Sequence, residues 1–258
     1  MPPQHASAPL THNVFFLRTM TLSAMLATWL ICAHWAQVEH LPTPAEVFAA
    51  IIDQTQSGEL FYHVTITLLR VLVSFFLALF IGAAIGIAMG RNQRINAALD
   101  DMLIIFLNIP ALVVIILCYI WFGLNEVAAI TAVAINKIPL VVTIMREAAR
   151  TIDQKLIDVA QVYRLSTAKK LTKVYLPQLY PSFMAASRSG LSLIWKIVLV
   201  VELLGRSNGV GFKLHSYFQL FDIASILAYT SVFVAIVLII DVAIIRPTEK
   251  YANRWRLT

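Results

Sequence analysis

The feature that most constrains this chain is a series of six long apolar stretches separated by short polar segments. They run roughly over residues 15–35, 62–89, 102–122, 127–145, 182–204 and 223–245. An α-helix needs about 20 apolar residues to cross the hydrocarbon core of a bilayer. Open strand edges and irregular backbone cannot be satisfied in contact with lipid. The pattern therefore predicts an all-α polytopic membrane protein with about six transmembrane helices.

Composition and missing motifs narrow the class of protein. The 258-residue chain is 59% hydrophobic and 13% charged, whereas soluble domains are about 45–50% apolar and about 25% charged. The sequence has no G-x-x-x-x-G-K-[ST] phosphate loop, which argues against an ATPase. It also lacks the H-E-x-x-H and G-x-S-x-G motifs of hydrolytic enzymes. Cys32 and Cys118 lie in apolar runs, where we expect buried thiols and no disulfide.

The distribution of charge between the apolar stretches predicts the orientation. Residues 38–61 contain Asp and Glu but no Lys or Arg, whereas residues 146–180 are rich in Lys and Arg. Further basic residues follow the second and sixth apolar stretches. Basic loops remain on the cytoplasmic side of a membrane. We therefore expect both termini and the segment 146–180 to be cytoplasmic.

The cytoplasmic segment contains two short amphipathic patterns. The first is an apolar stripe at helical spacing, formed by Leu156, Val159, Ala160 and Tyr163. Ser166 is placed to cap a second helix, with Ala168, Leu171 and Tyr175 on one face and Pro177 at its expected end. Such a pair of helices either lies on anionic lipid, held by its lysines, or inserts its stripe into a cytoplasmic partner.

This stretch resembles the EAA loop of ABC-importer permeases, whose pattern is roughly E-A-A-x3-G-x9-I-x-L-P. Its second Ala and its Leu-Pro are present at Ala160 and Leu176-Pro177, and Val174 takes the Ile position. The departures are Asp158 for Glu, Val159 for the first Ala and Arg164 for Gly. A left-handed turn at that Gly costs a non-glycine residue roughly 1–2 kcal/mol. We therefore expect at Arg164 either a different turn or a guanidinium that recovers this energy by binding a partner.

Four further motifs are similar to the nitrate/sulfonate/taurine branch of these permeases. They are LPTPAEVF at 41–48, TLLRVLVSFFLALFIGAAIGIAMG at 67–90, IWFGL at 120–124 and VVELLGRSNGVGF at 200–212. Because several widely spaced motifs occur in the right order, the resemblance extends over roughly residues 40–250. It implies a permease subunit of a bacterial inner-membrane importer that works by alternating access.

The resemblance also implies partners and a division of the chain. Expected partners are membrane lipid, a second copy of the chain, two cytoplasmic ATPase subunits that hold ATP and Mg, and a periplasmic or lipid-anchored solute-binding protein. No cofactor or nucleic acid is expected on this chain. The expected parts are a cytoplasmic tail (1–14), an N-terminal transmembrane helix (15–37), a periplasmic segment (38–61), a five-helix permease core (62–246) that contains the coupling loop (146–180), and a second cytoplasmic tail (247–258).

Two groups of residues are expected to carry the function. Those of the ATPase-coupling loop are Asp158, Val159, Ala160, Gln161, Tyr163, Arg164, Leu165, Ser166, Leu176 and Pro177. Polar residues within apolar stretches are costly and often line a pathway; the candidates are Asn108, Asn136, Lys137, Arg188, Lys196 and Glu202. No metal site is expected.

Each pathway candidate has a structural alternative. Pro110 and Pro139, close to the asparagines, are expected either to kink their helices only or to place the asparagines along a pathway. Glu202 is expected to pair with a cation, and Lys137 either faces an aqueous pathway or is clamped by Glu202 or by free carbonyls. Arg70 is expected to anchor its helix at the outer interface. The four-residue spacing of Gly82, Gly86 and Gly90 favours close helix packing.

The substrate is expected to be a small anion such as nitrate, taurine or another sulfonate, because lysines at the membrane midpoint favour negative charge. An aromatic acid or a pyrimidine precursor is the alternative within the same class of permease. A channel or secondary transporter would not need paired cytoplasmic helices, and we see no internal inverted repeat.

The predicted orientation can be tested by cysteine labelling in intact cells, in a background that lacks Cys32 and Cys118. A membrane-impermeant maleimide should modify a cysteine placed at Ser57 and spare one placed at Thr167, because only the first lies outside the cytoplasm. Permeabilised cells, in which both sites should react, provide the control. The reverse pattern in intact cells would overturn the orientation.

Overall fold

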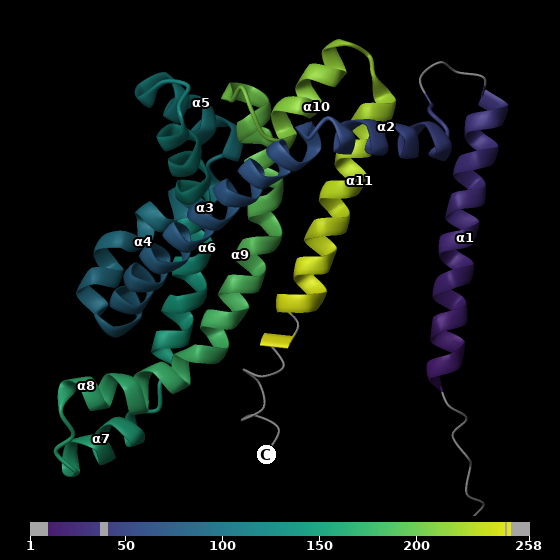
Figure 1. Ribbon diagram of the computed structural model, residues 1–258. Coiled ribbons are helices and arrows are strands. Elements are labelled where there is room, and N and C mark those ends of the chain that lie inside the picture. Colours follow the sequence, from purple (N-terminus) through teal and green to yellow (C-terminus); the bar gives the residue numbers. More distant parts are fainter. Residues whose placement is uncertain (1–9, 37–40, 246, 249–258) are drawn as a thin grey trace, which may run out of the picture.

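The structure is a computed structural model that describes residues 10–36, 41–245 and 247–248. Within these ranges the chain is almost entirely helical and has no strand (Figure 1). The elements are α1 (Leu10–Ala36), α2 (Pro44–Gln56), α3 (Glu59–Arg91), α4 (Gln93–Asn108), α5 (Ala111–Phe122), α6 (Glu126–Arg150), α7 (Gln154–Val162), α8 (Thr167–Lys170), the π-helix η1 (Leu171–Tyr175), α9 (Leu176–Gly205), α10 (Val210–Gln219), α11 (Ile223–Ile240) and the π-helix η2 (Asp241–Ile245).

Four helical segments in the described part of the chain are long and apolar enough to cross a membrane. They are Glu59–Arg91, Glu126–Arg150, Thr167–Gly205 and Ile223–Ile244. A fifth candidate is the pair α4 and α5, whose axes are bent by 99°. These five correspond to the last five of the six predicted spans, and the predicted all-α polytopic architecture is confirmed.

The first predicted span coincides with α1, a 27-residue helix that is about 40 Å long at 1.5 Å per residue. Residues 10–14, expected in a tail, belong to this helix; the remainder of the predicted tails lies almost wholly outside the described residues. In Figure 1, α1 stands apart from the other helices, and its described apolar side chains, such as Leu22 and Met25, are exposed. That α1 crosses the membrane stays a prediction.

The two cysteines differ in their surroundings. Cys118 is buried in α5, as predicted, whereas Cys32 is exposed on α1, so the expected buried thiol is wrong there. Both are free thiols. An apolar run in a membrane protein can face lipid as well as protein, and for this reason hydropathy alone does not distinguish the two positions.

The two intramembrane prolines behave differently. At Pro110 the helix is interrupted: α4 ends at Asn108, and Ile109 is extended, with φ −70° and ψ 126°. The helix is thus interrupted at this proline and changes direction by 99°, since proline disfavours helical backbone at the residue before it. Pro139 instead lies inside an unbroken α6.

The centre of the bundle is the close packing of α3 against α6. A Cβ atom added to Gly86 would lie 2.6 Å from the carbonyl oxygen of Val142, and one added to Gly82 would lie 2.7 Å from Cβ of Val141. Neither position has room for a side chain, which confirms the predicted packing role of these glycines. The helix α9 packs on the same pair, and Ile194, Trp195 and Val198 enter the shared core.

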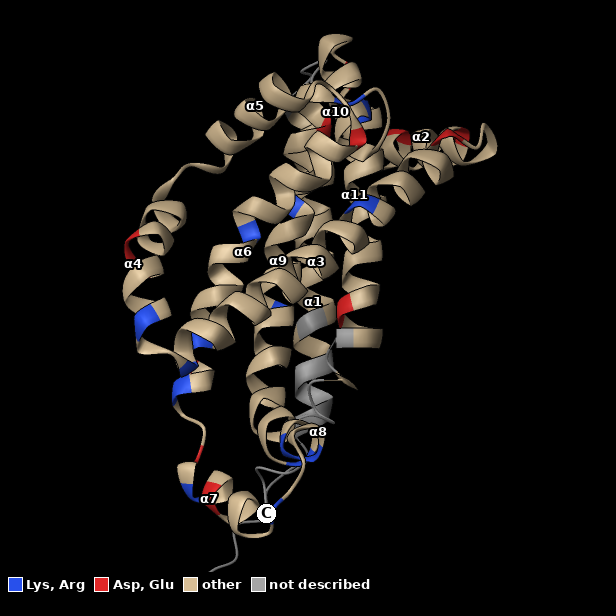
Figure 2. Cartoon of the chain, turned by 90° about the vertical axis from the view of Figure 1, so that its left-hand side faces the viewer, with Lys and Arg blue, Asp and Glu red and all other residues tan. Residues whose placement is uncertain are grey.

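The ends of the bundle carry different elements. Figure 1 shows α2, α5 and α10 at one end and α7 and α8 at the other. The helix α2 begins with a complete capping box. The side chain of Thr43 accepts from the N–H of Glu46, and the side chain of Glu46 accepts from the N–H of Thr43. In Figure 2, Lys and Arg gather near the end that carries α8. This end corresponds to the predicted cytoplasmic side.

The predicted second cytoplasmic helix begins as expected but does not end at Pro177. Ser166 caps α8 by accepting from the N–H of Lys169 at 3.4 Å. The chain then continues through η1 into α9, and Pro177 lies in the first turn of α9. Proline is tolerated at such a position because its missing N–H has no required partner there, and the wider π turn before it keeps the helix continuous.

Candidate functional site

The segment α7 presents an exposed apolar face at the end of the bundle. Val162 is 80% exposed and Tyr163 is 76% exposed, and Leu156 and Val159 lie on the same side. We call these four residues the apolar face of α7. Three exposed apolar side chains on the nine-residue helix, with Tyr163 directly after it, form a surface that a partner helix or groove can cover.

Ala160 differs from the predicted stripe. It is 2% exposed and lies on the opposite side of α7 with Ile157, which packs into a core cluster with Met145, Ile152 and Leu179. Ala160 and Ile157 therefore fix α7 to its own chain. The expectation that Ala160 belongs to the exposed stripe is wrong, because the two apolar sides of so short a helix cannot be told apart by spacing alone.

Arg164 ends α7 in the left-handed conformation that the family's glycine would favour. Its φ is +48°. The N–H of Leu165 donates to Ala160 O at 3.0 Å, and the N–H of Arg164 donates to Gln161 O at 2.9 Å. This pair of bonds is the Schellman motif. The turn is thus kept despite the substitution, and the Arg164 side chain is left exposed next to the apolar face of α7.

At the other end of the bundle, a buried polar network surrounds Glu202. The carboxylate is 0% exposed. It accepts from Nη1 of Arg70 at 2.7 Å, from Oγ1 of Thr67 at 2.9 Å and from the N–H of Gly211 at 2.8 Å. The predicted pairing of Glu202 with a cation is therefore observed. Its partner is Arg70, so the expected clamp between Lys137 and Glu202 is wrong.

Arg70 connects this carboxylate to other parts of the chain. Its guanidinium donates to both oxygens of Glu126, at 2.8 and 2.6 Å, and to the carbonyl oxygen of Asn208 at 2.9 Å. It also contacts the side-chain oxygen of Asn208. Arg206 donates to Glu126 at 2.6 Å from the other side. Helices α3, α6 and α9 and the loop before α10 are thereby joined.

The loop before α10 is also held by hydrogen bonds to His63 and Thr67, and its shape requires a glycine. The N–H of Gly209 donates to Nδ1 of His63 at 2.9 Å, and the N–H of Val210 donates to Oγ1 of Thr67 at 2.8 Å. Gly209 has φ +106°, and a Cβ atom there would overlap the Glu202 carboxylate. Only glycine meets both requirements. This accounts for the Gly in the quoted motif at residues 200–212.

Sequence reasoning identified Glu202 but missed its partner Thr67 and the other members of the network, His63, Glu126 and Asn208. Thr67, His63 and Glu126 are far from Glu202 along the chain, and no local spacing connects them. The available signal was the combination of an acidic residue inside an apolar run with a second, Glu126, at the start of another. Buried charges require partners.

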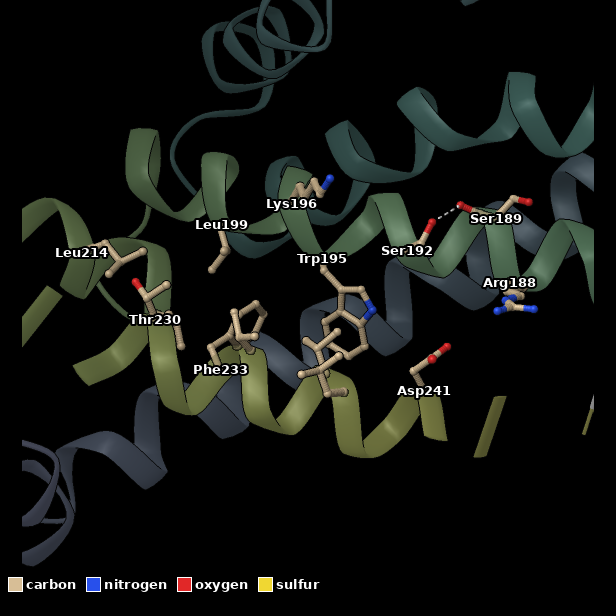
Figure 3. Close-up of a pocket in the computed structure, with 14 residues that line it drawn as sticks. Arg188, Ser189, Ser192, Trp195, Lys196, Leu199, Leu214, Thr230, Phe233 and Asp241 are labelled. Carbon is tan, nitrogen blue, oxygen red and sulfur yellow. Dashed lines mark hydrogen bonds between the residues drawn. The ribbon is translucent and has the colours of Figure 1, made fainter. Parts of the chain in front are cut away.

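The remaining pathway candidates do not form one cluster. Asn108 and Asn136 donate to carbonyls of their own helices, at Ile104 and Ala132. Lys137 is 5% exposed within α6, and no ion pair or hydrogen bond of its ammonium occurs among the described residues. Arg188 and Lys196 lie on α9 and line a cavity of about 570 Å³ between α9, α10 and α11 (Figure 3).

The cavity has an apolar wall and several polar lining residues. Trp195, Leu199, Leu214 and Phe233 contribute to the wall. Sequence reasoning named Arg188 and Lys196 but missed the other polar residues of the lining, which are Ser189 and Ser192 on α9, Thr230 on α11 and Asp241 directly after it. The signal was present in the sequence, since Arg188, Ser189, Ser192 and Lys196 recur on one face of a helix. Among the described residues, no group of three His, Cys, Asp or Glu side chains is placed to hold a metal ion.

Comparisons with known proteins decide the family. Residues 78–246 match the family model described as the binding-protein-dependent transport system inner membrane component. The chain belongs to this family. It is 31% identical over 216 residues, 84% of this chain and 78% of the relative, to the putative aliphatic sulfonates transport permease protein SsuC of Bacillus subtilis.

Two further relatives extend the comparison. The permease is 25% identical to the taurine transport system permease protein TauC of Escherichia coli, over 96% of this chain and 92% of the relative. It is 30% identical to the bicarbonate transport system permease protein CmpB of Synechococcus elongatus, over 62% of this chain and 58% of the relative.

A solved structure supports the fold. The permease matches a chain of the inward-facing methionine ABC transporter MetNI with a TM-score of 0.68 at 18% identity, covering 78% of this chain and 99% of that chain. Together with the sequence relatives, this match identifies the protein as a permease subunit of an ABC importer, which is not itself an enzyme. The resemblance predicted from the sequence motifs is confirmed.

The network around Glu202 predicts a large loss of stability on removal of one charge. In Glu202→Gln the amide retains an oxygen for Thr67 and Gly211 but leaves Arg70 without this carboxylate. Breaking a buried pair from one side typically costs about 3–5 kcal/mol. The variant should therefore unfold at a clearly lower temperature in detergent, as measured by fluorescence-detected size exclusion.

The matched control is Lys213→Met, which removes a pair with the half-exposed Glu59 at 2.6 Å. Exposed pairs contribute about 0–1 kcal/mol, so this variant should unfold close to the wild-type temperature. Equal shifts in the two variants would contradict the structural role assigned to Glu202.

Proposed function

We propose that the permease works as a homodimer that carries a small anion from the periplasm to the cytoplasm, driven by an ATPase that binds the apolar face of α7. We choose an anion as the substrate because of the polar residues in the middle of the membrane helices. Lys137 and Lys196 both lie within predicted spans, and neither has an ion pair among the described residues. Three relatives are named for the transport of sulfonates, taurine and bicarbonate. Such solutes agree with the positive charge of the two lysines.

The coupling proposal rests on the difference between the two sides of α7. Ala160 and Ile157 attach the helix to the bundle, while Val162 and Tyr163 are left exposed. Asp158, Gln161 and Arg164 surround the exposed side chains with polar groups. An apolar centre with a polar rim is the usual composition of a protein interface. The alternative of lipid contact fits less well, because Asp158 would then face an anionic membrane surface.

Transport follows from this arrangement by a change in the relative positions of the two copies. Closure of the ATPase dimer on ATP, with Mg, brings the two α7 segments together, and the helices attached to them reorient. A solute-binding protein delivers the anion at the opposite end. Both termini are cytoplasmic and the protein lies in the bacterial inner membrane. This is alternating access by rigid-body movement.

Docking can be tested with Tyr163→Asp, which places a charge on the apolar face of α7. Because Tyr163 is exposed, the permease should fold and insert normally, but its ATPase subunit should be lost during purification in detergent. Phe218→Asp is the matched control, since Phe218 is 66% exposed on α10 at the other end of the bundle. Retention of the ATPase by Tyr163→Asp would contradict the docking proposal.

The substrate class can be tested on the solute-binding protein that works with the permease. Taurine, ethanesulfonate, nitrate and bicarbonate are compared with benzoate and uracil in a thermal-shift screen. One of the first four should raise the melting temperature, because a ligand at a hundred times its Kd stabilises a protein by about 2.7 kcal/mol. A shift with benzoate or uracil alone would favour the alternative substrate class.

A further inference from the structure

The helix α9 carries a polar row of which the proposed function uses only Lys196. Arg188, Ser189, Ser192 and Lys196 occupy positions i, i+1, i+4 and i+8, which lie on one side of a helix. All four are exposed in the single chain. We call them the polar row of α9. The adjoining positions Ala186, Ile194 and Val198 are buried in the bundle, so the row lies on the side that this chain does not cover.

The row lies within Thr167–Gly205, one of the helical segments that are long and apolar enough to cross a membrane. Lys196 is nine residues before the end of α9 at Gly205, or about 14 Å along the axis. Arg188 is about 12 Å further in. A lysine facing lipid at this depth costs roughly 2.5–3.5 kcal/mol on insertion scales. Chains keep such residues where they face water or protein, and the proposed pathway between two copies would supply such a surface.

The cavity beside the row has a suitable size for a small solute. Its volume of about 570 Å³ falls within the range of about 300–1,000 Å³ found for ligand sites. Figure 3 shows Trp195 and Phe233 extending between α9 and α11, whereas the Lys196 side chain points away from these two rings. Lys196 still belongs to the lining of the cavity. The apolar wall can hold a short alkyl group, and the polar row faces the charged end.

The charges within the cavity are not evenly distributed. Asp241 lies at the same end as Arg188 (Figure 3), so positive and negative charge offset each other there. Among the described residues, no carboxylate pairs with Lys196 at the other end. The hydroxyl of Ser192 donates to the carbonyl oxygen of Ser189 at 3.0 Å, and that of Thr230 donates to Ile226 O at 2.8 Å. The ammonium of Lys196 is therefore the main donor available to an anion.

We propose that Lys196 is the main ligand of a transient oxyanion site in the pathway, with Ser192 beside it. Its ligand is a sulfonate, carboxylate or bicarbonate, and Trp195 and Phe233 accommodate any alkyl group. This inference rests on the proposed function and specifies its site. A single ammonium without a fixed counter-charge gives weak binding, which a transport site needs so that the ion can leave. Lys137, buried inside α6, is not part of the site.

The transport test uses the complete transporter, with its ATPase and solute-binding protein, in proteoliposomes. Uptake of labelled ethanesulfonate and of labelled bicarbonate is compared for wild type, Lys196→Gln and Lys196→Arg. Lys196→Gln should lower the uptake rate about tenfold, as expected for the loss of one charged hydrogen bond, while Lys196→Arg retains most of it. Arg94→Gln, which removes one exposed charge outside the membrane, should transport like wild type.

A second measurement does not depend on knowing the substrate. In a permease whose only tryptophan is Trp195, quenching by iodide is compared with quenching by neutral acrylamide. Lys196→Gln should lower the iodide constant severalfold and leave the acrylamide constant unchanged. The same ratio for wild type and Lys196→Gln would overturn the proposed site.

The outcomes separate the two proposals. If wild type imports neither anion but iodide quenching depends on Lys196, the choice of substrate is wrong and the anion site stands. If wild type imports an anion and Lys196→Gln imports it equally fast, the site is wrong and the proposed function stands. A Lys196→Gln complex that fails to assemble would give Lys196 a structural role and overturn the inference.

Discussion

The burial of Glu202 is the constraint on which the end of the bundle with α2, α5 and α10 depends. A carboxylate without water is tolerated only when opposite charge and hydrogen bonds surround it. Here Arg70, Thr67 and the backbone of Gly211 supply them, and Arg70 shares its guanidinium with Glu126 and Asn208. Every helix that contributes a group must therefore keep its position. The network fixes the spacing of α3, α6 and α9, and with it one wall of the cavity.

Features that depend on near neighbours in the chain could be predicted. The apolar stretches predicted the spans, because about 20 apolar residues suffice to cross a bilayer. The cap at Ser166 follows from residues within one turn of each other. The glycines of α3 were recognisable from their spacing alone. In each case one helix, or one turn, contains all the information.

Features that depend on distant partners could not be predicted from the sequence. Arg70 and Glu202 are separated by 132 positions, and either could have paired with another charge. The two prolines show the same limit: Pro110 ends a helix and Pro139 does not, although both sit beside an asparagine in an apolar run. The burial of Ala160 and the exposure of Val159 also depend on where the rest of the bundle lies. In a helix of nine residues, packing decides which side is covered.

The continuity of the helix from Thr167 to Gly205 has a mechanical consequence. Because η1 joins α8 to α9 without a break, a movement of α8 is passed directly to α9. Figure 1 shows that the helix changes direction at η1, so that α8 lies across the foot of α9. The far end of α9 carries Glu202, which Arg70 and Thr67 hold in place. A force applied beside α7 is therefore borne by the hydrogen bonds of a carboxylate at the opposite end of the bundle.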